Sequence, residues 1–253
     1  MTELICGIHP VREALRGRRR KPLELFLSGG HRPSRLEELV KEAAQAGVPV
    51  RFRERPDLDR LAGQVHHQGA VLRVEPFAYA ELEDLLRQWR DSGERAFFLL
   101  LDGITDPHNF GAILRSAEAA GCQGVIVPRD RACPVSEVVA RASAGALEHV
   151  LLCQVTNLAR TLEALKKEGV WVYGLAGEED STALHAVELT GDLALVVGSE
   201  GAGLRVNTRN HCDQLLAIAM RGRIASLNAS VAAGVALFEV VRQRDAAKEE
   251  RSR

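Results

Sequence analysis

The chain has 253 residues, of which 26% are charged and 46% are hydrophobic, a composition usual for a soluble globular protein. This length allows one large domain or two unequal ones. No apolar run approaches the roughly 18–20 residues that a membrane-spanning helix needs. The acidic start, residues 1–4, lacks the apolar core of a signal peptide. We therefore expect a cytoplasmic protein with no membrane partner.

The cysteines indicate neither a disulfide framework nor a metal site. They are five in number, and no two of them have the C-x-x-C spacing. We expect reduced thiols, most of them packed in the core. The residues concerned are Cys6, Cys122, Cys133, Cys153 and Cys212.

The net charge of -1 is unevenly distributed. Residues 1–76 hold 14 Lys+Arg and 10 Asp+Glu, hence +4, whereas residues 77–253 hold 19 and 24, hence -5. Such a local basic excess can neutralise RNA phosphates without choosing a sequence, although a solvated surface turn explains it equally well. The predicted RNA-binding residues are Arg12, Arg18, Arg19, Arg20 and Lys21.

Residues 1–76 are predicted to form a small α/β domain. Leu36, Leu39, Val40 and Ala43 lie on one helical face, and Gly47 ends that helix. The expected elements are helices over residues 9–15 and 35–46 and strands over residues 23–27, 48–52 and 70–74. Residues 77–95 follow as a linker helix, which could equally be the first helix of the second domain.

From residue 96 the pattern becomes regular and predicts a second α/β domain over residues 96–244. Its strand-length segments are apolar at consecutive positions, which is typical of parallel strands covered on both faces. The strands are expected at residues 96–101, 124–127, 150–155, 170–175, 193–197 and 215–220, with helices at 112–120, 135–147 and 158–167. Residues 245–253 form a charged tail that we expect to fray.

Chemistry is expected in the loops that follow these strands, because parallel sheets bind ligands beyond the carboxyl ends of their strands. The first such segment, residues 101–115, makes a turn and places Asn109 where a helix N-cap would stand. Arg115 follows in an alanine-rich helix. There it needs a carboxylate, a phosphate or water, and a plain salt bridge is the structural alternative.

The second segment, residues 193–204, contains glycines at 198, 201 and 203. Their order, G-x-x-G-x-G, differs from the dinucleotide-binding order, which disfavours a nucleotide-dependent dehydrogenase. Glu200 within the turn would repel a pyrophosphate, but it suits a cationic or hydroxyl-bearing ligand or an arginine. A plain glycine-rich turn is the alternative.

The third segment, residues 216–230, leads into a helix rich in small residues. Ser226 is the expected N-cap of this helix, and Asn228 would lie in its first turn, where backbone N–H groups remain free. The alternative is a buried helix start with satisfied polar caps.

Together the three segments resemble the signature motifs of the SpoU (TrmH-like) RNA 2'-O-methyltransferases of the SPOUT superfamily. The resemblance rests on residues 109–115, 198–204 and 226–230, and residues 7–15 and 67–69 extend it to the RlmB-type 23S rRNA guanosine 2'-O-methyltransferases. It covers nearly the whole chain, least securely residues 16–66 and 77–95. The chain departs from the family pattern at Ala219, where proline is usual, and at Ala229, where valine is frequent.

The resemblance implies an architecture and partners. The implied fold is a SPOUT-type α/β domain with a largely parallel sheet and a C-terminal trefoil knot, preceded by a small α/β RNA-binding domain related to a ribosomal protein. The partners are RNA, with 23S rRNA expected and DNA not expected, and a second copy of the chain in a homodimer. The implied cofactor is S-adenosylmethionine, and no metal is expected.

The resemblance also implies site residues. Gly177, Gly198, Ile218, Met220 and Leu227 would contact the cofactor. Arg115 would hold a substrate phosphate and stabilise the developing alkoxide. Asn109 would orient Arg115 or the ribose, Glu200 would fix Arg115 or a loop amide, and Ser226 and Asn228 would shape the nucleotide pocket. Two other functions stay open: a tRNA 2'-O-methyltransferase of the same family, and a catalytically silent RNA-binding protein.

Overall fold

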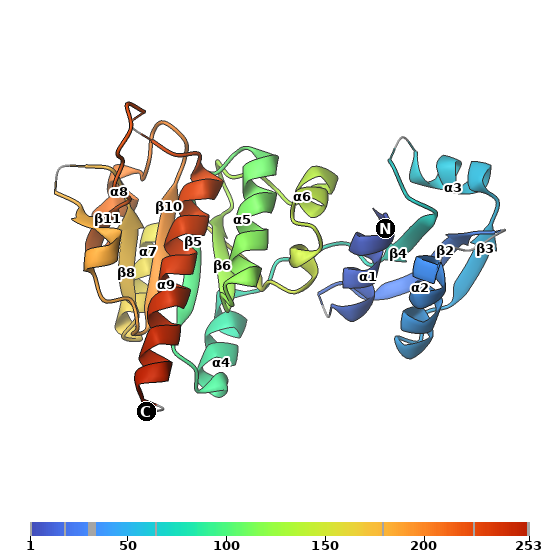
Figure 1. Cartoon of the computed structure of the whole chain (residues 1–253), viewed down its shortest axis with the longest axis horizontal. Helices are drawn as coiled ribbons and strands as arrows, with labels where there is room; N and C mark the ends of the chain where they lie inside the picture. Colours follow the sequence, from blue (N-terminus) through green and yellow to red (C-terminus); the bar gives the residue numbers. More distant parts are fainter. Residues whose placement is uncertain are drawn as a thin grey trace. The chain divides into compact units, whose positions relative to one another are not determined.

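The computed structural model describes residues 2–17, 19–29, 34–63, 65–178, 180–224 and 226–251. The chain divides into two compact units, Met1–Ala78 with Ser143–His149, and Tyr79–Ala142 with Val150–Arg253 (Figure 1). No helix in the described ranges combines the length and apolar character that crossing a membrane requires.

The first unit is a sheet with helices on both faces. The strand order is β1 (Glu3–Cys6), β4 (Ala70–Val74), β2 (Pro22–Ser28) and β3 (Val50–Arg53), with β4 antiparallel to both neighbours and β2 parallel to β3. Helices α1 (Ile8–Arg16) and α2 (Ser34–Gln45) pack on one face, and α3 (Arg55–Ala62) packs on the other. The predicted elements are confirmed, whereas β1 and α3 were not predicted.

The two N-terminal segments that carry the family resemblance meet in one turn. Gln68 Oε1 accepts a hydrogen bond from the first backbone N–H of α1, at Ile8 (3.2 Å). The buried ring of His67 accepts at Nδ1 from Gly69 N–H (3.0 Å). Its Nε2 therefore carries the proton and donates to Asp59 (2.9 Å). This turn fixes the start of α1.

A buried ion pair ties a distant segment into the first unit. Arg20 donates to Glu148 (3.1 Å, with a second bond from Nη2 to the other oxygen) and to Glu3 (3.0 Å). The side chains of Arg20 and Glu148 are each 4% exposed. Glu148 belongs to the short helix η1 (Ala146–Glu148), within the part of the first unit that follows α6 (Glu137–Ala142). The expectation that Arg20 lies on a phosphate-binding surface is corrected by this burial.

The second unit is built on a parallel sheet, as predicted. The strand order is β7 (Leu152–Val155), β6 (Gly124–Pro128), β5 (Phe97–Asp102), β10 (Leu193–Gly198), β8 (Trp171–Leu175), β11 (Gln214–Ala217) and β9 (Thr182–Ala183). Every neighbouring pair in this order is parallel. All the carboxyl ends of these strands therefore lie at one edge of the sheet.

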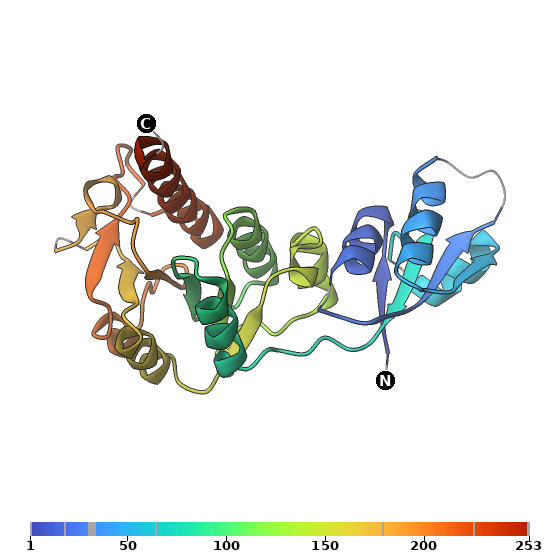
Figure 2. The ribbon, with the colours of Figure 1, turned by 90° about the horizontal axis from the view of Figure 1, so that it is seen from below.

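Helices cover both faces of this sheet. Phe98 and Leu100 point into a core with α4 (Leu82–Ser92) and α7 (Leu158–Lys167), so α4 belongs to the second unit. The alternate residue Phe97 points to the opposite face, where the Arg244 guanidinium of α9 lies 4.9 Å from its ring centre. Helices α5 (Pro107–Ala119) and α9 (Ala229–Arg251) lie side by side there (Figure 2).

The helix predicted over residues 135–147 is shorter in the structure. Helix α6 ends at Ala142 because the chain then turns through positive φ angles at Ala144 (50°) and Gly145 (97°). Helix α9 is longer than predicted, because it continues through residues 245–251, which were expected to fray.

Replacing Glu148 by alanine is expected to lower the free energy of unfolding by about 3–5 kcal/mol, because it leaves the buried Arg20 guanidinium without its main partner. Urea unfolding followed by circular dichroism measures the loss. The exposed pair Glu137–Arg141 gives the control, since Glu137→Ala should cost under about 1 kcal/mol. A double variant, Arg20→Met with Glu148→Leu, should recover most of the stability. A loss below about 1 kcal/mol for Glu148→Ala would contradict the role assigned to this pair.

Candidate functional site

The three segments singled out in the sequence leave the sheet at the same edge. They follow β5, β10 and β11, and β10 pairs directly with β5 in a register that sets Gly198 opposite Asp102. Two of the loops therefore start side by side, and the third reaches them through the start of α9.

Helix α5 begins earlier than the sequence analysis expected. Asp106 is its N-cap, with Oδ1 accepting from the backbone N–H of Asn109 (2.8 Å), and Pro107 is the first helical residue. The prediction of Asn109 as the N-cap is thus wrong. Since Asp106 performs the capping, the carboxamide of Asn109 is available for bonds to other loops.

The glycines after β10 are required by a close backbone approach. Ser199 and Gly203 exchange backbone hydrogen bonds of 2.9 and 3.1 Å, which folds the turn back onto the end of the strand. A Cβ atom at Gly198 would overlap the backbone of Gly203, and Gly201 and Gly203 have positive φ angles of 79° and 63°. This turn presents Glu200 to the neighbouring loops.

Helix α9 is capped by Asn228. Its Oδ1 accepts from Ser230 N (2.9 Å) and Val231 N (3.3 Å), and the helix begins at Ala229. The prediction of Ser226 as the N-cap is therefore wrong, because Asn228 stands next to the first free N–H groups. Ser226 lies before the helix with an exposed side chain.

One carboxylate oxygen joins the three segments. Glu200 Oε1 accepts from Asn109 Nδ2 (2.9 Å), from Asn228 Nδ2 (2.5 Å) and from the backbone N–H of Ala229 (3.3 Å). Asn228 Nδ2 also donates to Asn109 Oδ1 (2.9 Å), which closes the ring of bonds. A negative charge at the first turn of α9 is also favoured by the helix dipole. Of the two roles expected for Glu200, the structure shows the bond to a loop amide.

Arg115 lies outside this network. It is exposed on α5, and within the part of the chain that the structure describes it makes no hydrogen bond and no ion pair. Its neighbour Ser116 faces α9, where Oγ lies 3.8 Å from the position that a Cβ on Gly234 would take. The salt bridge considered as the structural alternative is thus not found among the described residues, and the guanidinium is free to meet an anion.

The expected cofactor contacts lie in the loops after β8, β10 and β11. Gly177 is exposed with open space around it, Gly198 is buried in the turn, and Ile218 is half-buried. Met220 and Leu227 expose 39% and 36% of their surface, so their apolar side chains are accessible to a ligand. An apolar face beside an open glycine backbone suits an adenosine, so these residues fit S-adenosylmethionine.

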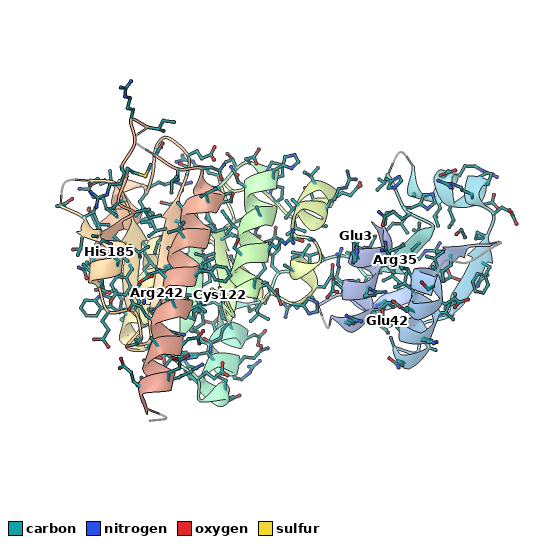
Figure 3. The ribbon with its side chains drawn as sticks, viewed as in Figure 1. Glu3, Arg35, Glu42, Cys122, His185 and Arg242 are labelled. Carbon is teal, nitrogen blue, oxygen red and sulfur yellow. The ribbon has the colours of Figure 1, made fainter. Side chains whose placement is uncertain are left out.

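The expected RNA-binding residues differ in exposure and in partners. Arg12 is engaged by Glu38 and Glu42 between α1 and α2, where Figure 3 labels Glu42. Arg19 is half-buried, Lys21 is exposed, and Arg18 lies outside the described residues. Arg20 is buried, as reported above.

Two further carboxylates that were not predicted from the sequence, Asp102 and Asp106, shape this edge. Asp106 could have been found, because Asp-Pro at a helix start is a capping signal. Asp102, at the end of β5, was missed because its partner lies far along the chain. Its Oδ2 accepts from the backbone N–H of Arg205 (2.9 Å), and its Oδ1 lies 3.3 Å from Arg205 Nε. This pair fixes the exit of the glycine turn against β5.

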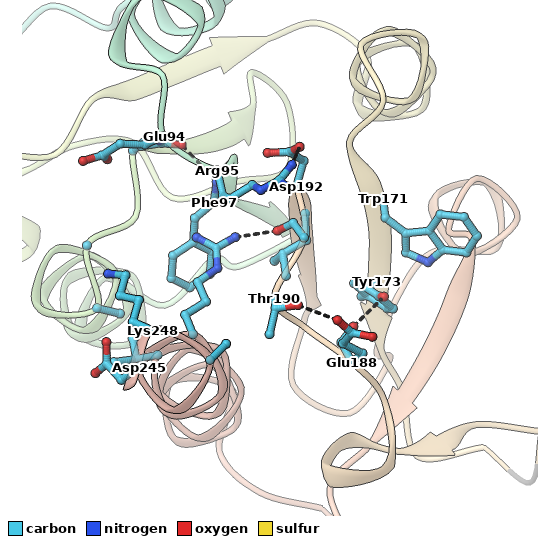
Figure 4. Close-up of a pocket in the computed structure, with 18 of the residues that line it drawn as sticks. Glu94, Arg95, Phe97, Trp171, Tyr173, Glu188, Thr190, Asp192, Asp245 and Lys248 are labelled. Atoms are coloured by element: carbon cyan, nitrogen blue, oxygen red, sulfur yellow. Dashed lines mark hydrogen bonds and ion pairs between the residues drawn. The ribbon is translucent and has the colours of Figure 1, made fainter. Parts of the chain in front are cut away.

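A cavity of about 1000 Å³ lies at the amino edge of the sheet, beside the first residues of β5, β8 and β10 (Figure 4). Arg244 donates there to the carbonyls of Ala96 and Gly191 (both 2.7 Å), and burial lowers the pKa of its guanidinium. None of residues 109–115, 198–204 and 226–230 contributes to its lining. We therefore place the functional site at the carboxyl edge.

Comparisons with known proteins identify the family of the chain. The model of the SpoU rRNA Methylase family matches residues 96–238, and a model for RNA 2'-O ribose methyltransferase substrate binding matches residues 4–80. The chain is 47% identical over 244 residues to the 23S rRNA (guanosine-2'-O-)-methyltransferase RlmB of Yersinia pestis, covering 96% of this chain and 98% of that protein.

Solved structures show the same fold. The SpoU methyltransferase AviRb from Streptomyces viridochromogenes, in complex with the cofactor AdoMet, superposes with a TM-score of 0.78 at 25% identity, over 97% of this chain and 91% of that one. The A. aeolicus TrmH/SpoU tRNA modifying enzyme matches with a TM-score of 0.56 at 27% identity, over 66% of this chain and 86% of that one.

Two substitutions at Asn228 separate its two roles. Asn228→Ala removes the cap and the amide bonds, so the free energy of unfolding should fall by about 1–2 kcal/mol. Asn228→Ser keeps a capping oxygen but loses the amide donors, so it should cost about 0.5 kcal/mol or less. Hydrogen exchange in residues 199–203 should accelerate in both variants. Unchanged exchange there would show that the network does not hold the glycine turn.

Proposed function

Because the chain belongs to the SpoU rRNA methylase family, we propose that it transfers a methyl group from S-adenosylmethionine to the 2'-hydroxyl of a guanosine in 23S rRNA. The observation that carries the proposal is the set of bonds that Glu200 makes to Asn109, Asn228 and Ala229. These bonds bring all three motif segments to one edge of the sheet.

An rRNA substrate is favoured over a tRNA by the extent of the matches. The 23S rRNA methyltransferase of Yersinia pestis corresponds to 96% of this chain, including the first unit, whereas the A. aeolicus tRNA modifying enzyme corresponds to 66%. The first unit also matches the substrate-binding model of RNA 2'-O ribose methyltransferases. We place the target in the peptidyl-transferase region by analogy with the RlmB type, and expect the protein to act in the cytoplasm.

The bound cofactor would supply an electrophilic methyl group on a sulfonium. Gly177, Ile218, Met220 and Leu227 would hold it by backbone and apolar contacts. The carboxylate of Glu200 would add negative charge near the positively charged sulfonium of the cofactor.

The remaining chemistry falls to positioning and charge stabilisation. A ribose hydroxyl is a weak acid, so the site must favour its alkoxide. A guanidinium has N–H donors and no acceptor, so Arg115 serves as a donor rather than a base. We assign it to the substrate phosphate and to the developing alkoxide, since no group in the described chain occupies it. Asn109, Glu200 and Asn228 hold the loops that bound the ribose.

A homodimer is supported by an exposed apolar stripe on α9. Val231, Val235 and Phe238 expose 50%, 43% and 48% of their surface and recur at helical spacing on one side. Ala233, Ala236 and Val240 form the buried side. A stripe of this kind is typical of a helix that packs against a second copy.

We also propose the trefoil knot that the family resemblance implies. It is supported by the bond from Ala229 N to Glu200, because the segment that leaves β11 returns to the turn after β10 at the start of α9, so the two loops that would form the knot lie together.

Replacing Arg115 by alanine should abolish methyl transfer and leave the cofactor affinity within a few-fold of the parent protein. The reason is that the guanidinium serves the RNA rather than the cofactor loops. Incorporation of labelled methyl groups into 23S rRNA transcripts measures the first effect, and calorimetry measures the second. Arg87→Ala, on α4, is the control and should be fully active. Turnover near the parent rate in Arg115→Ala would refute the assignment.

The substrate itself is tested by mass-spectrometric mapping of the methylated nucleotide, with primer extension on 23S rRNA and tRNA from a deletion strain. A missing methyl group in tRNA alone would favour the tRNA alternative. Cofactor binding without transfer to either RNA would favour a catalytically silent RNA-binding protein.

Replacing Phe238 by lysine should convert the dimer to a monomer, because two charges would be buried at an interface with two-fold symmetry. Sedimentation equilibrium measures the change. Trp171→Lys is the control, since Trp171 is 51% exposed on β8, outside the exposed stripe of α9, and should leave the dimer intact. A parent protein that is already monomeric would contradict the proposed homodimer.

A further inference from the structure

A second cavity lies beside the functional site, at the same edge of the sheet. Its volume is about 360 Å³, and it lies among the loops that follow β5, β6 and β7 and the first residues of α7 and of α8 (Val206–Arg209). Neighbouring strands are ~4.8 Å apart, so the cavity begins on β5 and extends about 10 Å away from β10. It therefore adjoins the loop from β5 to α5, residues 103–106, without containing any residue of the Glu200 network.

One arginine of this cavity is held by a buried carboxylate. The Asp102 side chain is fully buried, and its Oδ1 pairs with Arg205 Nε at 3.3 Å without completing a hydrogen bond. The Arg205 side chain remains 40% exposed, and no other side chain of the described residues pairs with it. Its terminal N–H groups are thus positioned by the fold and left available to an anion.

A second arginine is held in a strained backbone conformation. Arg131 follows β6 with a φ angle of 57°, the left-handed region that disfavours a side chain with a Cβ. Its side chain is exposed, and among the residues described nothing bonds to it. Residues in this region of φ occur both in tight turns and at ligand sites, so the exposed and unpaired guanidinium of Arg131, rather than its backbone, indicates a ligand.

Neutral polar groups complete the lining. Asn157 caps α7 through Oδ1 (3.2 Å to Arg160 N), which leaves its amide N–H groups for a ligand. Asn207 and Thr156 are exposed beside it, and Asp130 is the acidic group at the rim. Two guanidinium groups next to carboxamides and a hydroxyl match the chemistry of a nucleotide, with a phosphate and a base edge.

We infer that this cavity binds a nucleotide of the RNA strand next to the methylated one, with its phosphate on Arg131 and Arg205 and its base against Asn157 and Asn207. The inference rests on the proposed function, because it assumes an RNA substrate. A subsite of this kind would set the strand direction across the carboxyl edge.

The test replaces Arg131 by glycine, which accepts the left-handed φ and removes the guanidinium. Binding of the full-length variant to a 23S rRNA transcript is measured at several salt concentrations. One lost phosphate contact should reduce the slope of log affinity against log salt by about 0.7–0.9. The KM for RNA should rise about five- to tenfold at unchanged kcat, and the dissociation constant of S-adenosylmethionine should not change.

Lys167→Ala is the matched control. Lys167 ends α7 at the opposite edge of the sheet, so this variant loses the same charge away from the cavity. Asn207→Ala gives a second contrast, since it should weaken RNA binding without changing the salt slope. Equal slopes and KM values for Arg131→Gly and Lys167→Ala would overturn the inference, and so would a weakened cofactor affinity in Arg131→Gly.

The two proposals fail in different ways. If the parent protein does not methylate any RNA, the proposed function fails, while the salt slopes still report whether Arg131 contacts the RNA backbone. If the parent protein methylates 23S rRNA and Arg131→Gly retains the full slope and KM, only the subsite is refuted.

Discussion

The site depends on the three hydrogen bonds that converge on Glu200 Oε1. The donors come from Asn109, 91 residues away, and from Asn228 and Ala229, 28 and 29 residues away. None of these contacts is local, so the arrangement exists only when β10 pairs with β5 and α9 returns across both. A charged acceptor is suited to this task, because it strengthens each bond and also favours the start of α9.

This arrangement separates a rigid frame from a free functional group. Glycine packing, the Asp102–Arg205 pair and the caps of α5 and α9 fix the loops around the edge of the sheet. Arg115 is attached to the same frame through α5, but its guanidinium has no partner in the described chain. The Glu200 bonds fix the loops before a substrate arrives, so only the Arg115 side chain has to adjust when the substrate binds.

The sequence predicted the parallel sheet well, because strands covered on both faces are apolar at consecutive positions. Of the five residues that the family resemblance proposed for catalysis, Asn109, Glu200 and Asn228 lie together, whereas Arg115 and Ser226 lie outside their hydrogen bonds. Prediction failed at the helix caps, since several polar residues stand near each helix start and the one that caps is decided by where the helix begins. It failed for Arg20 because a run of charges does not reveal a buried carboxylate 128 residues away.

The placement of Ser143–His149 in the first unit has a consequence for how such proteins acquire and exchange modules. A fusion that moved residues 2–78 to another enzyme would leave Arg20 buried without its carboxylate, unless the short insert carrying Glu148 moved with them. The recipient would need compatible sequence at two separate places in its gene. Recombination at one junction would therefore yield a module that folds poorly, which favours joint inheritance of both parts.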